Sequence, residues 1–391
     1  MKAIISYFIV FISSVMYMLL FDKKAGGIMT VFITVTPILS LILTCMTKNK
    51  LTFSLNTPDS IVDKNKPVSL SVNITKDTVL PIPIVSFNLD ISKRFASLEQ
   101  NIYRFSMSEN KKLSIKADII PQICGIGDIS VNNIFITDYL GIFKFRINRN
   151  DDISTKLFIR PDIKEIDDSG ELIRNIYNTL CDNDEDDTTD SVAGRSAFPG
   201  YEYREYIPGD SLKKINWKIS TKRRKLFVRK DESAGITLPD IIINNSETLS
   251  FEDETEKMLS EQMIVENSLA LLLLCVKHGI ECTYSYVRGG VVKKETVSFS
   301  EQVEMIAGDM ASVTFSEREI DIENNGGVKS TNVNIVYTLG CTQKFAQNIE
   351  QTSLNGDSSR VIMPGSLVKK MKNTLSDLWI INNDHSISKY V

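Results

Sequence analysis

Two long uncharged apolar runs open the chain and predict a pair of membrane-spanning helices. The runs extend from Ala3 to Phe21 and from Ile28 to Met46, with six residues between them. As a helix, each run is about long enough to cross a hydrocarbon core of ~30 Å. We therefore expect a transmembrane helical hairpin over residues 1–50 and a multi-pass protein of the cell membrane.

Each run also has another interpretation, a cleaved signal peptide for the first and a buried core helix for the second. A signal peptide usually has a shorter apolar core and a small-residue cleavage site, so the hairpin is favoured. Lys2, Lys48 and Lys50 flank the outer ends of the pair, whereas Lys23 and Lys24 lie between the runs. The positive-inside rule then places both termini, and with them the soluble domains, in the cytoplasm.

Over residues 51–160, apolar and polar side chains alternate with a period of two. The clearest stretches run from Val68 to Thr75, from Val85 to Ser92 and from Leu113 to Ile119. Period-two alternation is typical of strands with one buried face, and several such strands between turns predict an all-β sandwich. Within this region, Pro81 and Pro83 are expected to mark a loop or a sheet edge.

The period changes again in the last third of the chain, where short apolar runs alternate with helical patterns. Asp240–Ile243 and Val333–Leu339 read as buried strands, and Ser250–Lys277 and Gln343–Leu354 read as helices. Alternating strands and helices predict an α/β domain with a mostly parallel sheet. Residues 161–200 are left as a connector, whose acidic run Cys181–Asp190 lacks the glycine and glutamate of an EF-hand and reads as a solvated loop.

Composition and motif content argue against most enzyme classes. The net charge is −4, which gives no global case for nucleic-acid binding, and the six cysteines are scattered, as expected for reduced structural thiols. Only two histidines occur, His278 and His385, so a histidine-based metal site or catalytic triad is not expected. The phosphate-binding, zinc-protease and serine-hydrolase motifs are absent from the sequence. We therefore predict a protein that is not an enzyme and has no cofactor.

The stretch from Tyr201 to Asp231 stands out because it is basic within an acidic protein. Between Arg204 and Lys230 it holds ten Lys/Arg residues against two acidic residues. Pro208-Gly209 predicts a turn, after which Asp210 is placed to cap a helix over Ser211–Ser220. A basic loop, Lys222-Arg223-Arg224-Lys225, then leads into a strand at Leu226-Phe227-Val228.

This stretch, with Gly125–Gly127, Asp138–Phe143 and Ile159–Pro161 upstream, resembles a known family. The run Arg204-Glu205-Tyr206…Pro208-Gly209-Asp210…Ile215…Trp217 is similar to the signature of the "domain of unknown function 58" family. The resemblance covers essentially the whole chain. It implies that the α/β part, residues 201–391 with the basic motif, is a von Willebrand factor A-like (Rossmann-like) domain. It also implies a MoxR-type AAA+ ATPase as partner.

Intact domains of that type bind Mg²⁺ through an Asp-x-Ser-x-Ser loop after their first strand. The resemblance places Asn244, Ser246 and Thr248 at these positions, so an amide replaces the carboxylate. Hard divalent cations depend on anionic oxygen ligands, and we expect Mg²⁺ binding here to be weak or absent.

The basic stretch is the candidate partner-binding site. We expect its apolar side chains, Trp217 among them, to pack on the α/β core and its charged side chains to dock an acidic surface of the ATPase. The predicted docking residues are Arg204, Glu205, Tyr206, Asp210, Trp217, Lys222, Arg223, Arg224 and Arg229. The resulting hypothesis is a membrane-anchored, non-enzymatic interaction or assembly protein. The alternative is an anionic-lipid or nucleic-acid binding protein that uses the basic loop at 222–225.

Overall fold

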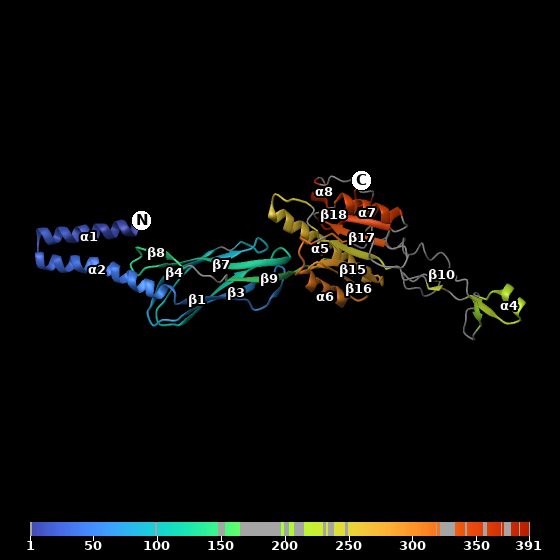
Figure 1. Ribbon diagram of the computed structural model, residues 1–391, viewed down its shortest axis with the longest axis horizontal. Helices are drawn as coiled ribbons and strands as arrows, with labels where there is room; N and C mark the ends of the chain where they lie inside the picture. Colours follow the sequence, from blue (N-terminus) through green and yellow to red (C-terminus); the bar gives the residue numbers. More distant parts are fainter. Residues whose placement is uncertain are drawn as a thin grey trace. The chain divides into compact units, whose positions relative to one another are not determined.

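The computed structural model divides the chain into two compact units, Met1–Arg160 and Pro161–Val391. It describes residues 2–97, 100–147, 153–164, 197–198, 203–206, 215–229, 232–233, 238–246, 249–317, 319–320, 333–340, 342–354, 358–368, 370, 377–382 and 384–390. The acidic run at 181–190 and Asp210 lie outside these residues, as does Thr248. Figure 1 traces the elements of each unit along the chain.

Two apolar helices, α1 (Lys2–Leu20) and α2 (Lys23–Lys48), form an antiparallel pair at the start of the first unit. Asp22 caps α2 by accepting a hydrogen bond from the Lys24 backbone N–H at 2.9 Å. The Ser14 and Thr30 hydroxyls meet between the helices at 3.0 Å. Most large apolar side chains of both helices are exposed, which is the surface expected of helices in a non-aqueous environment.

Among the described helices, only two are long and apolar enough to cross a membrane, α2 and α5 (Glu254–Lys277). The apolar part of α1 is shorter. Helix α5 is mostly buried inside the second unit and is a core helix of that unit. Helix α2 is exposed, near the N-terminus, and has the length and surface of an anchor or a signal.

Two sheets, antiparallel except for the parallel pair β2 and β9, form the β-sandwich that follows. One has the order β1-β3-β6 and the other β2-β9-β7-β4-β5, with β8 paired to β7. The strands are β1 (Leu51–Asn56), β2 (Ile61–Asp63), β3 (Val68–Lys76), β4 (Ile82–Ile91), β5 (Ile102–Met107), β6 (Lys112–Ile119), β7 (Gly125–Thr137), β8 (Lys144–Arg146) and β9 (Ser154–Arg160).

The predicted alternation is confirmed along these strands. In β3 every second residue from Val68 is buried, and in β4 Val85, Phe87 and Leu89 are almost completely buried. The expectation for Pro83 was wrong, because it lies inside β4, a strand with neighbours on both sides. The register of β4 shifts between Ile82 and Val85, so a bulge accommodates the missing N–H of the proline.

The second unit contains a seven-stranded mixed sheet of order β16-β15-β14-β17-β18-β19-β20. Strands β15, β14, β17, β18 and β19 are parallel, and β16 and β20 are antiparallel at the two edges. The elements are β14 (Asp240–Asn244), α5, β15 (Cys282–Arg288), β16 (Val291–Val297), α6 (Ser300–Met310), β17 (Val333–Thr338), α7 (Gln343–Leu354), β18 (Ser358–Pro364), α8 (Gly365–Val368), β19 (Leu378–Ile381) and β20 (Ile387–Lys389).

The chain enters this sheet at β14, extends it through β15 and β16 on one side, and returns through α6 to add β17 on the other side. In Figure 1, α6 lies beside β16, and α7 and α8 lie beside β18. The point where strand order reverses, at the carboxyl ends of β14 and β17, is where ligands bind in open α/β sheets. The alternating elements thus form the expected α/β unit and direct attention to this edge.

Two tyrosines of this sheet, Tyr284 and Tyr337, bury their hydroxyls and predict an alkaline response. Tyr284 donates to or accepts from Ser268 at 3.0 Å, and Tyr337 donates to Asn267 at 2.9 Å. Burial raises the pKa of both Tyr284 and Tyr337 above the value of about 10 expected in the unfolded chain. The stability that they contribute is therefore complete below pH ~10 and is lost as the pH rises above it.

We expect the phenolate absorbance of these two tyrosines to appear only together with the loss of the far-ultraviolet circular dichroism signal. Complete ionisation of every tyrosine in a protein with unchanged circular dichroism would contradict the burial of Tyr284 and Tyr337.

Candidate functional site

The basic stretch forms a small hairpin with a helix between its strands. Strand β11 (Tyr203–Glu205) pairs antiparallel with β12 (Phe227–Arg229), so Arg204 lies opposite Val228 and Glu205 opposite Phe227. The Tyr206 N–H donates to the Leu226 carbonyl at 2.9 Å and extends the pairing by one residue. A second short ribbon pairs β10 (Ala197–Phe198) with β13 (Glu232–Ser233) outside the first.

Helix α4 (Trp217–Arg223) begins later than the sequence predicts. Asn216 is its N-cap, since the Asn216 side chain accepts from the Ile219 N–H at 3.2 Å. Ile215, expected inside the helix, forms a β-bridge with Val228 instead. The predicted helix over Ser211–Ser220 is therefore wrong at Ile215, because the chain there is held by backbone pairing rather than by the helix.

A compact apolar centre holds this hairpin together. Ile215, Phe227 and Val228 are buried, and the buried Ser220 hydroxyl accepts from the Phe227 N–H at 2.8 Å. Arg224 ends the helix in the left-handed conformation, with φ of 53°, which turns the chain into β12. None of these apolar residues belongs to either of the two large core clusters of the described residues. The hairpin thus has its own centre, and its apolar residues do not serve as core for the sheet.

Trp217 does not pack inward as expected. It is 64% exposed, and Leu226 is 42% exposed. Exposed cations accompany them on α4 and the loop that follows it: Lys218, Lys222, Arg223, Arg224 and Lys225. Arg223 lies over the Phe227 ring, 5.4 Å from its centroid, so this guanidinium also packs against the hairpin. We call Trp217, Lys218, Lys222 and Arg224 the α4 face.

The structure brings Tyr206, Trp217, Lys222, Arg223 and Arg224 together on this hairpin, and Arg204, Glu205 and Arg229 lie on its two strands. No acidic residue occurs within α4 or the basic loop after it. The arrangement therefore offers an exposed indole on a helix that also carries several exposed cations, which together can contact an acidic surface.

The second candidate site is the carboxyl edge of β14 and β17. The Asn244 amide donates to the Thr338 hydroxyl at 3.3 Å, and the Gly340 N–H donates to the same hydroxyl at 3.2 Å. Asn244 Oδ1 and Ser246 Oγ are buried and have no hydrogen-bond partner among the described residues. In the part of the chain that the structure describes, two neutral oxygens are therefore left without a hydrogen-bond partner at the positions where the resemblance places metal ligands.

These oxygens are a poor fit to Mg²⁺, which prefers a site with at least one carboxylate. Asp240, the acid at the start of β14, is engaged elsewhere: it accepts from Ser285 and from Lys294, each at 2.8 Å. No group of three histidine, cysteine, aspartate or glutamate side chains capable of holding a metal occurs in the described part of the chain. Among the described residues, the unsatisfied oxygens at this edge are thus neutral and fit Mg²⁺ poorly.

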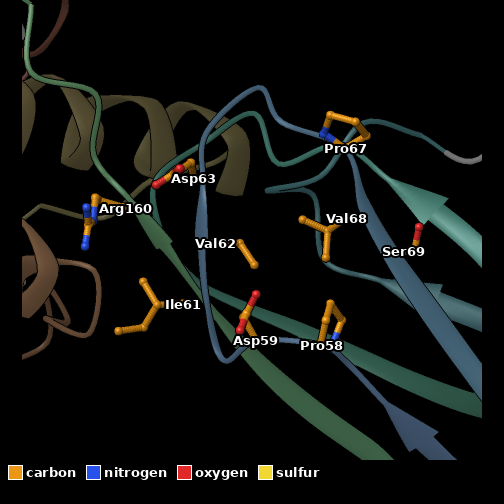
Figure 2. Close-up of a pocket in the computed structure, with 9 residues that line it drawn as sticks. All are labelled: Pro58, Asp59, Ile61, Val62, Asp63, Pro67, Val68, Ser69 and Arg160. Atoms are coloured by element: carbon orange, nitrogen blue, oxygen red, sulfur yellow. The ribbon is translucent and has the colours of Figure 1, made fainter.

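A recess of about 540 Å³ lies at one end of the sandwich, where β2, β3 and β9 meet. Figure 2 shows Asp63 and Arg160 on one side of it and Ser69 on the other. Lys66 donates to Asp63 at 2.7 Å and, with the charge of Arg160, lowers the pKa of that carboxyl. Ser69 donates to Asp118 at 2.6 Å, but no histidine lines the recess to act as a base. Its geometry does not assemble a nucleophile.

Comparison with known proteins finds similarity for a β region alone. No family model matches the sequence, and no characterised protein matches it. Among solved structures, the CARDB domain of the PF1109 protein from Pyrococcus furiosus has a TM-score of 0.22 and 15% identity and covers 28% of this chain and 91% of that domain. A fragment of Escherichia coli alpha-2-macroglobulin, from domain MG7 to the C-terminus, has a TM-score of 0.24 and 16% identity and covers 29% of this chain and 17% of that one.

Because these TM-scores are low, the matches carry no argument about the fold family or the function of this chain. The resemblance to the domain of unknown function 58 family rests on the motif residues and stays a prediction.

Proposed function

We propose that this chain is a membrane-anchored, non-enzymatic interaction protein that docks an acidic partner protein on the α4 face. The observation that carries the proposal is the 64% exposure of Trp217 on a hairpin whose apolar centre, Ile215, Phe227 and Val228, is already buried. Tryptophan and arginine dominate the binding energy of protein interfaces, where a central aromatic residue is surrounded by polar contacts. An exposed tryptophan among cations fits that role better than a role in folding.

The charge of the α4 face selects the partner. Lys218, Lys222 and Arg224 are exposed, and an acidic surface that meets them gains in association rate and in discrimination against basic partners. The resemblance stated above makes a MoxR-type AAA+ ATPase the expected partner. Helix α2 would hold the protein at the membrane, and α1 would form a second span beside it.

The expected result of removing the tryptophan is a loss of partner binding. Truncating a hot-spot tryptophan costs about 2 kcal/mol or more, which is roughly thirtyfold in Kd. We expect the full-length, detergent-solubilised protein to retain an AAA+ ATPase in affinity capture, and Trp217→Ala to lose it. A charge-reversed variant, Lys222→Glu/Arg224→Glu, should lose it as well, while Arg223 over the Phe227 ring is left in place to keep the hairpin folded.

Matched controls separate docking from general surface damage. Val291 on β16 is also 64% exposed, so Val291→Ala removes an equally exposed apolar side chain elsewhere. Lys112→Glu/Lys116→Glu reverses two exposed charges on β6. Both controls should bind the ATPase like the wild type. Equal capture by Trp217→Ala and the wild type would refute the proposal.

The alternative function, anionic-lipid or nucleic-acid binding through residues 222–225, rests on the same cations. A titration of the full-length protein with single-stranded DNA, and another with phosphatidylserine vesicles, separates the two. If the α4 face docks a protein, both DNA and vesicles should bind weakly, and Trp217→Ala should bind them as weakly as the wild type does. Tight binding that falls steeply with salt would replace the proposal with the alternative.

A further inference from the structure

The β-sandwich carries an exposed apolar rim at the end where it meets α2. Val79, Ile84, Tyr139, Leu140 and Phe143 are between 37% and 93% exposed. Val79 and Ile84 come from the start of β4 and the loop before it, and the other three come from the loop between β7 and β8. The Tyr139 hydroxyl donates to the Pro81 carbonyl and joins the two loops. We call these five residues the collar.

The collar loop is fastened to α2. Asp138, only 2% exposed, accepts from the Ser40 hydroxyl at 2.9 Å, and the Tyr139 N–H donates to the same hydroxyl at 3.1 Å. The second oxygen of Asp138 accepts from the Phe143 N–H at 2.7 Å, which closes the loop. Figure 1 shows α2 running to the end of the sandwich that holds β4 and β8. The position of the collar along α2 is therefore fixed.

Helix α2 has two different faces at this level. Ser40, Thr44 and Thr47 are buried against the sandwich, whereas Ile38, Leu39, Ile42 and Met46 on the other side are more than half exposed. From Ser40 to Met46 the helix rises about 9 Å at 1.5 Å per residue. The loop that touches Ser40 thus lies about two turns before the last exposed apolar residue of α2. If that apolar side of α2 lies in lipid, the collar lies at the same depth.

We propose that the collar inserts into the interfacial region of the bilayer that α2 spans. Apolar side chains with a tyrosine are typical of the membrane interface, where aromatic residues gather and where apolar faces sink about 5–10 Å below the headgroups. The carboxylate of the collar loop, Asp138, accepts a hydrogen bond at each oxygen, which is the condition for tolerating charge at that depth. The inference rests on the membrane-anchor part of the proposed function.

Insertion would hold the sandwich at a set depth and angle on the membrane surface, rather than leaving it on a free tether. The bilayer is the occupant that the structure favours, because the collar loop is hydrogen-bonded to α2 at Ser40, a level at which α2 still carries exposed apolar side chains. The part of the bilayer that would contact the collar is the phospholipid headgroup and upper acyl region.

Brominated phospholipids test the insertion in proteoliposomes of the full-length protein. The protein has two tryptophans, exposed Trp217 and buried Trp379, so a Trp217→Phe background leaves one shielded fluorophore. In this background, Leu140→Trp places a probe in the collar at a position that is already 38% exposed. Ile61→Trp places a probe at a 46% exposed position in β2, which pairs through β9 with the start of β7, at the end of the sandwich opposite the collar loop. Val35→Trp, 52% exposed in α2, reports the anchor itself.

We expect bromine to quench Leu140→Trp and Val35→Trp several-fold more than Ile61→Trp, with a blue-shifted emission for Leu140→Trp. If bromine quenches the fluorescence of Val35→Trp but not that of Leu140→Trp, insertion of the collar is refuted, whereas the membrane anchor is supported. Failure to quench either would overturn the anchor and, with it, the collar. Unchanged circular dichroism of each variant establishes that the fold is intact.

Discussion

Replacing Gly127 with alanine is expected to destabilise the β-sandwich by about 1–3 kcal/mol, the usual cost of overpacking a core. A Cβ atom at Gly127 would lie 2.5 Å from Cε2 of Phe95 and 2.6 Å from its Cζ. The ring cannot move aside freely, because Phe95 is 4% exposed and its N–H donates to the Ser92 carbonyl at 3.1 Å. Hydrogen exchange of the β4 and β7 amides in the full-length protein measures the loss.

The matched variant for this prediction removes the obstacle. Phe95→Leu takes away the ring atoms that the new methyl group would meet, so the cost of Gly127→Ala should shrink in that background. A double-mutant cycle gives the coupling between the two positions. Additive effects, or unchanged exchange in Gly127→Ala, would show that the close approach of Gly127 to Phe95 is absent in solution.

Replacing Gly26 with alanine is expected to push α1 and α2 apart, at a similar cost of about 1–3 kcal/mol. A Cβ atom there would lie 2.4 Å from the Met18 Cα, which is backbone and cannot rotate away. Small residues allow helices to approach closely in membranes, where close packing takes the place of the hydrophobic effect. The next residue is a natural control, since a Cβ at Gly27 would lie 4.0 Å from Met18 Sδ, an ordinary van der Waals contact.

Disulfide trapping measures the helix separation. Ser14→Cys/Thr30→Cys replaces two hydroxyls that are 3.0 Å apart, in a Cys45→Ser background because Cys45 is exposed on α2. Oxidation should be several-fold slower with Gly26→Ala and unchanged with Gly27→Ala. Equal rates in all three proteins would contradict the packing of α1 on α2.

The period of apolar residues was sufficient to predict most of the fold. Alternation along Val68–Thr75 identifies β3 because each sandwich strand buries one face, and the helix expected over Gln343–Leu354 is α7 with the same bounds. Strand β20 was missed, since its three residues, Ile387–Lys389, are too few to show a period. Local patterns fail where an element is short or where a proline lies in a bulge, as at Pro83.

Tertiary contacts explain what the sequence did not reveal. The run Ile28–Met46 reads as uniformly apolar, yet one side of its last third is covered by the sandwich. The signal was present in the spacing of Ser40, Thr44 and Thr47, which places three hydroxyls on one face of the helix. Trp217 was expected to pack on the α/β core with the other apolar side chains of the basic stretch. Ile215 and Phe227 already supply the centre of the hairpin, so the indole is left exposed.

The candidate metal position shows how far local chemistry could be read from sequence. The substitution of Asn244 for an acid indicated weak binding, and the structure adds that Asp240 is occupied by Lys294 and Ser285. Which neutral oxygens remain unsatisfied, Asn244 Oδ1 and Ser246 Oγ, depends on side-chain positions that only the fold determines.

Site-specific photocrosslinking in intact membranes tests the central claim most directly. A photoreactive phenylalanine at position 217 should give one main protein adduct on irradiation, containing an AAA+ ATPase. The same probe at the equally exposed position 291 should not give that adduct. An adduct of equal yield at both positions, or an adduct with lipid alone at position 217, would contradict the assignment of the α4 face as a protein-docking surface.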